Sequence, residues 1–312
     1  VRCGAPYFGL ECRANIDGIS TQRIFENRAG NHYCGRDKRE IASLMGPVQQ
    51  SCAVRFAVIF MLLPLLVGIL FWDGAAQAGQ FKKKKPTGVS SQDLRRPLLK
   101  PEQPWTAVGR VSIRNGSFCS GTLITPTRVL TAVHCVWNNQ TRRWLSPQDV
   151  RFQAGYSRGK HLAYSKVREI VRAPGATMDR TGKLTDPAKD WAVLKLAAEI
   201  SGIPNLQPIP LVRLKDLPLL KDGGEISQAG YSFDRAQLLT IVDSCRLVAN
   251  RQSQGGGTIM LHDCDATFGD SGSPVMMRID GDLRVVGINS AVWRGKGKQL
   301  GLAVRLPGGL LD

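Results

Sequence analysis

The sequence has few of the features that mark helical, metal-binding or membrane-embedded proteins. No long segment has the 3.6-residue apolar period of an amphipathic helix, which argues against a helical bundle. The cysteines beyond residue 78 are not in close pairs, so we predict no zinc site. Long uncharged apolar runs are equally scarce, and the clearest one, residues 56–72, lies in the front third of the chain. The remainder consists mostly of short apolar segments.

Acidic side chains are outnumbered, since 25 Asp and Glu stand against 42 Lys and Arg, a net charge of +17. From residue 79 onward the balance is still +15, with 34 basic and 19 acidic residues. Such a charge attracts acidic surfaces. Apart from the lysines at 82–85, however, the basic residues are scattered, and we find no nucleic-acid-binding motif. We expect no specific nucleic-acid partner; the alternative, a polybasic surface binder that depends on residues 82–85, would show steep salt dependence.

Residues 45–78 have the pattern of an export signal. Arg55 precedes the 17 uncharged residues, and Ala76-Gln77-Ala78 supplies small residues at the spacing that a signal peptidase accepts. We expect cleavage after Ala78, which gives a secreted or periplasmic protein with no stable membrane anchor. A membrane-spanning anchor is the alternative, because 17 residues is the lower limit for crossing a bilayer. The proline and glycine inside the run favour cleavage.

The segments on either side of this signal have no recognisable domain pattern. Residues 1–44 begin with Val and lack periodicity; because Met45 would place the signal at the extreme N-terminus, we interpret them as an extension upstream of the true start. A cytosolic extension that carries cysteines is the alternative. Residues 79–104 are basic and rich in Pro, Gly and Ser, which predicts a solvated propeptide or linker. The folded domain is expected over 105–312.

Within that domain, short apolar or alternating runs recur between turn signals. Asn115-Gly116 and Asp280-Gly281 are typical hairpin sequences. Six such runs fall in each half of the domain. This spacing predicts an all-β protein made of two six-stranded antiparallel β-barrels.

Three segments carry the candidate chemistry. Ser271 lies in Gly269-Asp270-Ser271-Gly272-Ser273-Pro274, where the glycines permit a tight bend and leave the peptide N–H groups of Gly269 and Ser271 free to stabilise an oxyanion. A serine at neutral pH needs a base and an orienting acid. His134 ends an apolar run and precedes Cys135, while Asp190 stands at the start of a strand-like segment. We assign these as nucleophile, base and acid.

These segments, in the order His, Asp, Ser, resemble the trypsin-like (chymotrypsin-fold) serine endopeptidases. The resemblance covers about Trp105 to Leu306. Ser-Gly-Ser-Pro after the nucleophile is more similar to the bacterial secreted branch that includes glutamyl endopeptidases. The family resemblance implies an active site in the cleft between the barrels, polypeptide substrates, an acyl-enzyme on Ser271, and no cofactor or metal. We also expect a monomer. A catalytically silent protease-fold binding protein is the alternative class.

The resemblance also implies a disulfide between Cys119 and Cys135, which would pin the loop that holds the histidine. Cys245 and Cys264 are then left as the second pair, in keeping with the even cysteine count of an exported chain. Buried reduced thiols are the alternative.

Counting back from the nucleophile, the resemblance puts Asp265 at the base of the primary specificity pocket and Gly301 on its wall. Ser290 and Val292 are further candidates for its lining. A carboxylate there predicts cleavage after Arg or Lys. A preference for small apolar residues stays open because Val292 would narrow the pocket, and a preference for Glu is weakened by Asn289, where glutamyl endopeptidases carry a histidine.

Finally, the resemblance suggests zymogen control. Asp270 matches the position whose carboxylate pairs with a newly cut α-amino group, and a terminus near Val89 could supply it. The alternative is that Asp270 accepts hydrogen bonds from local backbone.

Overall fold

The computed structural model describes residues 23–26, 32–35, 85–100, 102–295, 298–307 and 310. The chain divides into two units, 1–80 and 81–312. In the first, β1 (Arg23–Glu26) and β2 (His32–Gly35) pair antiparallel, in a stretch for which we expected no domain. The expected export signal lies outside the described residues. Among those that are described, no helix is long and apolar enough to cross a membrane.

In the second unit, the first barrel contains residues 108–196 and is closed. Its six antiparallel strands follow one another around the ring in the order β10, β11, β6, β5, β4, β9. They are β4 (Val108–Ile113), β5 (Phe118–Thr125), β6 (Arg128–Thr131), β9 (Val150–Ala154), β10 (Ala163–Arg172) and β11 (Ala192–Leu196). A small hairpin, β7 (Trp137–Asn138) and β8 (Arg143–Trp144), projects between β6 and β9.

The sequence pattern explains this ring. At the start of β10, buried and exposed side chains alternate, as one face of the strand points into the barrel. Between β4 and β5, Gly116 takes a φ of +88°, which a residue with a side chain adopts only with strain. The barrel interior is filled by fully buried Leu123, Leu130, Phe152 and Leu194.

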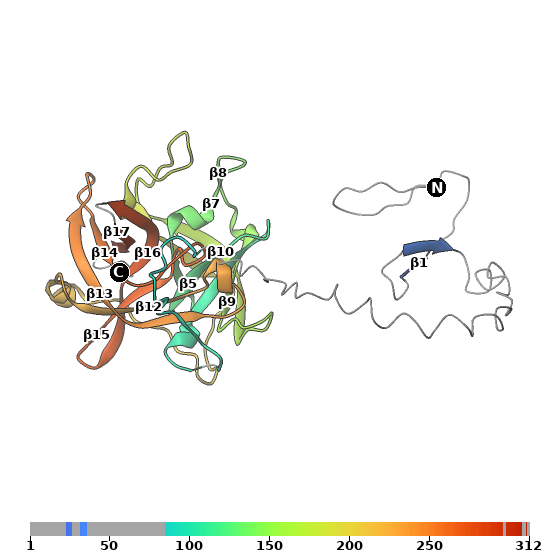
Figure 1. The fold of residues 1–312 in the computed structure, drawn as a ribbon, viewed down its shortest axis with the longest axis horizontal. Helices are drawn as coiled ribbons and strands as arrows, with labels where there is room; N and C mark the ends of the chain where they lie inside the picture. Colours follow the sequence, from blue (N-terminus) through green and yellow to red (C-terminus); the bar gives the residue numbers. More distant parts are fainter. Residues whose placement is uncertain are drawn as a thin grey trace, which may run out of the picture. The chain divides into compact units, whose positions relative to one another are not determined.

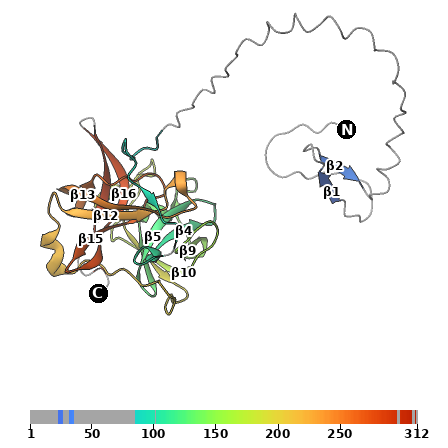
Figure 2. The same ribbon diagram turned by 60° about the horizontal axis from the view of Figure 1, so that its bottom comes forward.

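The second barrel contains residues 225–305. Its strands are β12 (Glu225–Gly230), β13 (Thr240–Gln252), β14 (Thr258–His262), β15 (Pro274–Ile279), β16 (Asp282–Gly295) and β17 (Lys298–Arg305). They run in the order β12, β15, β16, β17, β14, β13, and the pairing of β12 with β13 closes the ring. Figures 1 and 2 show the two barrels side by side, with β5, β9 and β10 in the first barrel and β13, β15 and β16 in the second. The prediction of two six-stranded antiparallel barrels is confirmed.

Six short 3₁₀ turns connect the strands, and no α-helix occurs in the described part of the chain. They are η1 (Trp105–Ala107), η2 (Val133–Val136), η3 (Pro147–Asp149), η4 (Pro187–Lys189), η5 (Leu214–Leu219) and η6 (Phe233–Arg235). Three of these turns, η2, η4 and η6, lie next to the candidate site.

Residues 85–98 form an ordered segment against the second barrel, which we call the strap. Its short strand β3 (Arg96–Pro97) pairs with residues 240–241 at the start of β13. The strand β14 pairs with β13 only farther along, at residues 247–252. The Arg95 side chain is 1% exposed. Charge and Pro/Gly content predicted a solvated segment and a domain that begins at Trp105. The folded unit instead includes the strap, because its arginines find carboxylate partners on the barrel.

Candidate active site

The candidate base and acid come from two 3₁₀ turns of the first barrel. His134 lies in η2, directly after β6, where the Cys135 N–H donates to the Ala132 carbonyl. Asp190 follows η4, whose start is capped by Asp186 accepting the N–H of Ala188. Because β6 and β11 are paired neighbours, the turns at their ends meet.

Asp190 binds His134 at two points. Nδ1 of His134 lies 2.7 Å from Oδ2 of Asp190, and the His134 backbone N–H donates to Oδ1 over 3.0 Å. The Ser290 hydroxyl, from β16 of the second barrel, donates to Oδ2 over 2.5 Å. The carboxylate is therefore fully partnered although its side chain is only 3% exposed. This arrangement places the ring proton on Nδ1 and leaves Nε2 as the acceptor.

The two groups shift each other's pKa. Burial disfavours the imidazolium, but the negative charge and hydrogen bond of Asp190 outweigh it, so the pKa of His134 is raised above its usual value. Burial also opposes the charge on Asp190. The charge and hydrogen bonds of His134, together with the Ser290 hydroxyl, nevertheless hold the pKa of Asp190 below its usual value. The carboxylate thus stays ionised and orients the imidazole.

Ser271 sits on a tight bend between the two barrels. Gly269 and Gly272, on either side of it, have φ of +88° and +78°. A Cβ on Gly272 would lie 2.3 Å from Thr131 Oγ1 and 2.7 Å from the Ala132 nitrogen, so only glycine fits against the strand that leads to His134. The Ser271 carbonyl accepts from the N–H of Ser120 over 2.9 Å. The bend that carries Ser271 is therefore bound to the barrel that carries the base.

The disulfides strengthen this connection. Cys119 and Cys135 are bridged, as are Cys245 and Cys264, so both predicted pairings are confirmed. The sulfur of Cys135 lies 3.9 Å from His134 Nε2 and 3.8 Å from the Ser271 carbonyl oxygen. The cluster of Cys119, His134 and Cys135 offers no metal site, because both sulfurs are already consumed in the bridge.

Two peptide N–H groups on the bend that carries Ser271 have no hydrogen-bond acceptor among the described residues. Those of Gly269 and Ser271 donate to no described residue, whereas the neighbouring N–H groups of Asp270, Gly272 and Ser273 all donate to backbone carbonyls. A pair of free donors on the nucleophile's own loop is what an oxyanion hole requires.

Asp265, the candidate for the base of the specificity pocket, is occupied by the strap. Its Oδ1 accepts the N–H of Ser90, and its Oδ2 accepts the Ser90 hydroxyl over 3.0 Å and the Leu94 N–H over 2.6 Å. Its side chain is buried. In this structure Asp265 anchors the strap and offers no free carboxylate to a basic side chain. No sequence pattern indicates this role, because the partners are two backbone N–H groups and a hydroxyl that lie 171 and 175 positions away along the chain.

The other pocket candidates also meet the strap or the site. Val292 of β16 and Gly301 of β17 are paired neighbours in the sheet. A Cβ on Gly88 would lie 2.7 Å from Val292 Cγ2 and 2.1 Å from the Ala266 oxygen, so the strap runs between these groups. Gly301 is covered on its other side by the ring of His262. Ser290 binds Asp190 through its hydroxyl.

Asp270 accepts local hydrogen bonds, from the Thr267 N–H and the Ser232 hydroxyl, both over 2.8 Å. Its other oxygen, Oδ1, is buried without a described partner, and burial raises the pKa of Asp270 to about 6. The strap around Val89, expected to supply an amino group to Asp270, instead bonds to Asp265 and Ala266 in the intact chain.

One buried polar chain behind the nucleophile escaped sequence reasoning. His262 Nε2 lies 2.7 Å from Asn289 Oδ1, and the Asn289 amide donates to the Ser273 hydroxyl over 2.8 Å. Gln228 donates to the same hydroxyl over 3.1 Å. Burial lowers the pKa of His262 to about 4, which keeps it neutral. The polar residues at buried strand positions were the available signal.

Comparison with known proteins places this geometry in a family. The family model described as Trypsin matches residues 97–307, about two thirds of the chain. A solved structure titled "Structure of Glu endopeptidase in complex with MPD" superposes with a TM-score of 0.54 at 20% identity. That match covers 68% of this chain and 90% of the other, and it shows the shared two-barrel fold. The chain therefore belongs to the trypsin family of serine endopeptidases.

Proposed function

We propose that Ser271, His134 and Asp190 form a working catalytic triad that hydrolyses peptide bonds. Ser271 Oγ attacks the substrate carbonyl while His134 Nε2 takes the hydroxyl proton. Asp190 keeps the second imidazole proton on Nδ1 and stabilises the imidazolium. The observation that carries the proposal is the 2.7 Å contact between His134 Nδ1 and an ionised, buried Asp190, on the barrel against which the Ser271 loop packs.

The tetrahedral intermediate carries its negative charge on the former carbonyl oxygen. The free N–H groups of Gly269 and Ser271 are the donors available to it. Collapse expels the amine, which takes its proton from His134 and leaves an ester on Ser271. Water, deprotonated by the same histidine, then attacks the ester, and the histidine returns the proton to Ser271 Oγ as the acid leaves. These steps need no metal or cofactor.

The test is labelling with an organophosphonate, together with peptide hydrolysis. We expect one adduct per chain on Ser271 and none in Ser271→Ala or His134→Ala. Both variants should lose roughly four to six orders of magnitude in hydrolysis, because the members of a triad act as a unit. A protein that binds peptides but takes up no phosphonate would favour the silent binding protein instead.

Substrate preference is a separate proposal. Polypeptides are the substrates that the family implies, and cleavage after Arg or Lys stays a prediction that needs a free Asp265. Because three strap hydrogen bonds occupy that carboxylate, a strap-bound enzyme should not select a basic residue through it. A peptide library cut with wild type and with Asp265→Ser decides this: an unchanged profile assigns Asp265 to the strap alone.

Export is supported by the two disulfides, since such bridges persist in oxidising compartments. We propose that residues 45–78 direct export and that cleavage follows Ala78. The N-terminal mass of the protein recovered from the medium or periplasm tests it, and a form that begins at residue 1 would contradict it.

A further inference from the structure

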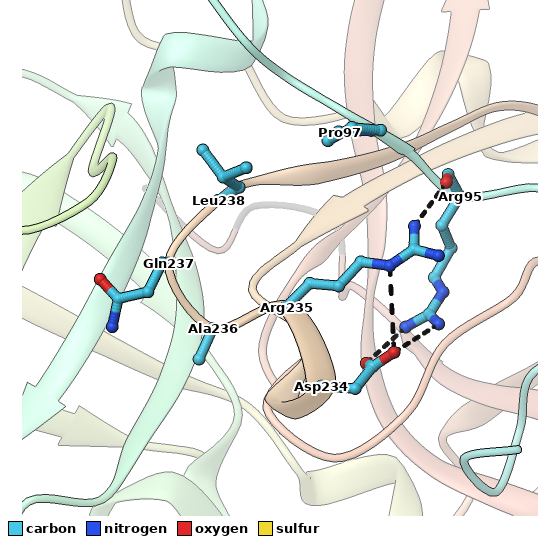
Figure 3. A pocket seen from close by; sticks show the side chains of 7 residues that line it. All are labelled: Arg95, Pro97, Asp234, Arg235, Ala236, Gln237 and Leu238. Atoms are coloured by element: carbon cyan, nitrogen blue, oxygen red, sulfur yellow. Dashed lines mark hydrogen bonds and ion pairs between the residues drawn. The ribbon is translucent and has the colours of Figure 1, made fainter. Parts of the chain in front are cut away.

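The strap carries a buried arginine that the proposed chemistry does not use. Arg95 donates to Asp234 through both terminal nitrogens, over 2.8 and 2.9 Å, and to Asp93 through Nε and one terminal nitrogen, over 2.9 and 3.1 Å. Arg235 closes the cluster by donating to Asp93 and to the Arg95 carbonyl. Figure 3 shows the Asp234 carboxylate facing the Arg95 guanidinium, with Arg235 reaching back to the strap.

The partner of Arg95 belongs to a loop that touches the nucleophile bend repeatedly. Within this loop, residues 231–235, the Ser232 hydroxyl donates to Asp270, and the Phe233 N–H donates to the Phe268 carbonyl over 2.7 Å. Gly269 also lies against it: a Cβ there would be 2.4 Å from the Tyr231 oxygen. The loop therefore contacts Gly269, one of the two residues that bear the proposed oxyanion donors, together with its neighbours Phe268 and Asp270.

The hydrogen bond at Phe268 sets the direction of one of those donors. The Phe268 carbonyl and the Gly269 N–H belong to the same peptide group, and a planar trans peptide directs its C=O and N–H to opposite sides. While Phe233 holds the carbonyl, the Gly269 N–H must face away from the loop. If that peptide rotated, the carbonyl oxygen would take the place of the donor and repel the oxyanion.

We infer that Arg95 is a positioning residue of the oxyanion hole: by clamping Asp234 it fixes Phe233, whose N–H orients the Phe268–Gly269 peptide. The inference rests on the proposed function of Ser271. It assigns the strap to the active enzyme rather than to a discarded propeptide. An arginine suits this role, because its rigid fork binds two carboxylates at once and restrains the loop in orientation as well as in position.

The neighbouring arginine supplies a matched control. Arg96 also ties the strap to the second barrel, through a two-point contact with Asp243 on β13, but the structure gives it no bond to residues 231–235. Arg95→Met removes the ion pairs with Asp93 and Asp234, and Arg96→Met removes those with Glu102 and Asp243. Only the first change releases the loop. We expect Arg95→Met to lower kcat about ten- to a hundredfold with KM little changed. This loss in kcat is smaller than the one expected when an oxyanion donor is removed outright. The kcat of Arg95→Lys should lie between those of Arg95→Met and wild type.

A second pair of variants tests the Phe233 hydrogen bond without changing the ion pairs of Arg95. Phe233 is the first residue of η6, a position that accepts proline, and Ser232 before it has φ −65° and ψ 140°, which suit a residue preceding proline. Phe233→Pro removes the N–H that holds the Phe268 carbonyl. Phe233→Leu keeps that N–H and changes only a side chain that is 72% exposed. We expect kcat of the proline variant to be about tenfold or more below that of the leucine variant.

A peptidyl aldehyde probes the hole directly. Its carbonyl carbon bonds to Ser271 Oγ, the hydroxyl proton passes to His134, and the new oxyanion lies where the substrate's would. For Arg95→Met and Phe233→Pro, aldehyde affinity should fall by the same factor as kcat. Equal kcat in Arg95→Met and Arg96→Met, or in the two Phe233 variants, would overturn the inference. Retained hydrolysis in Ser271→Ala would instead overturn the proposed function.

Discussion

Both barrels have apolar cores, but they hold the polar groups of the site in different ways. The first holds the base and acid, and Asp190 at its rim has a partner for each oxygen. The second holds the nucleophile beside a buried polar chain, where Asp270 Oδ1 and His262 Nδ1 are buried without described partners. Unsatisfied buried polar groups lower stability. The strap adds hydrogen bonds to this barrel elsewhere, at Asp265 and at the start of β13.

The largest expected effect is in the first barrel. Asp190→Asn should lower kcat by about 10⁴-fold, because an amide at this position favours the wrong imidazole tautomer. Asp186→Asn is the matched control, since an asparagine can still cap η4. Steady-state hydrolysis of one peptide by both variants tests the prediction. If Asp186→Asn lost activity and Asp190→Asn did not, the assignment of Asp190 as the catalytic acid would be wrong.

The contact between the barrels at Gly272 is expected to contribute strongly to the free energy of unfolding. Gly272→Ala adds a Cβ 2.3 Å from Thr131 Oγ1, at a φ of +78°. Left-handed strain and overpacking together should cost about 2–5 kcal/mol of unfolding free energy. Gly281→Ala meets the strain alone, because no atom lies within 4 Å of its Cβ, and should cost about 1–2 kcal/mol. Urea unfolding measures both, and equal costs would mean that the barrels are not packed through Gly272.

The disulfides offer one comparison between the barrels at similar loop length. Their sequence separations are 16 and 19 residues, so removing either pair should cost about 3 kcal/mol on the chain-entropy scale. Activity should respond differently, because Cys135 adjoins His134. In conditions where both variants stay folded, the Cys119→Ser/Cys135→Ser protein should lose more kcat than Cys245→Ser/Cys264→Ser. Equal losses would show that the first bridge only stabilises the fold.

Sequence patterns anticipated the parts of this molecule that rest on local or repeated signals. Alternating runs and Asn-Gly or Asp-Gly turns predicted both barrels. The motifs around His134, Asp190 and Ser271 predicted the candidate site. In the fold His134 and Asp190 are in contact, and the Ser271 bend is bound to the same barrel. The contacts of Asp265 and Arg95 were not anticipated, because they depend on partners far along the chain. Charge counts predict solvation, and only the folded structure shows which charges are matched by buried carboxylates.

A pH-dependent effect is expected at Asp270, which is buried in the second barrel. Burial raises its pKa from 3.8 in the unfolded chain to about 6 in the folded protein. A raised carboxylate pKa means that the folded state binds the proton more tightly, so this contribution to stability is complete below pH 3.8 and is lost as pH rises through 6. The full span is about 3 kcal/mol.

Asp270→Asn removes this titration while its side-chain oxygen can still accept from Thr267 and Ser232. The variant should match wild type near pH 4 and be more stable by up to about 3 kcal/mol at pH 7 and above. His262 titrates in the same range with the opposite sign, since its pKa is lowered to about 4. Because both proteins retain His262, its contribution cancels in the difference between their unfolding free energies. If the difference in unfolding free energy between the two proteins did not change between pH 4 and 8, ionisation of Asp270 would cost no stability. Solvent or the strap would then supply a partner for Oδ1.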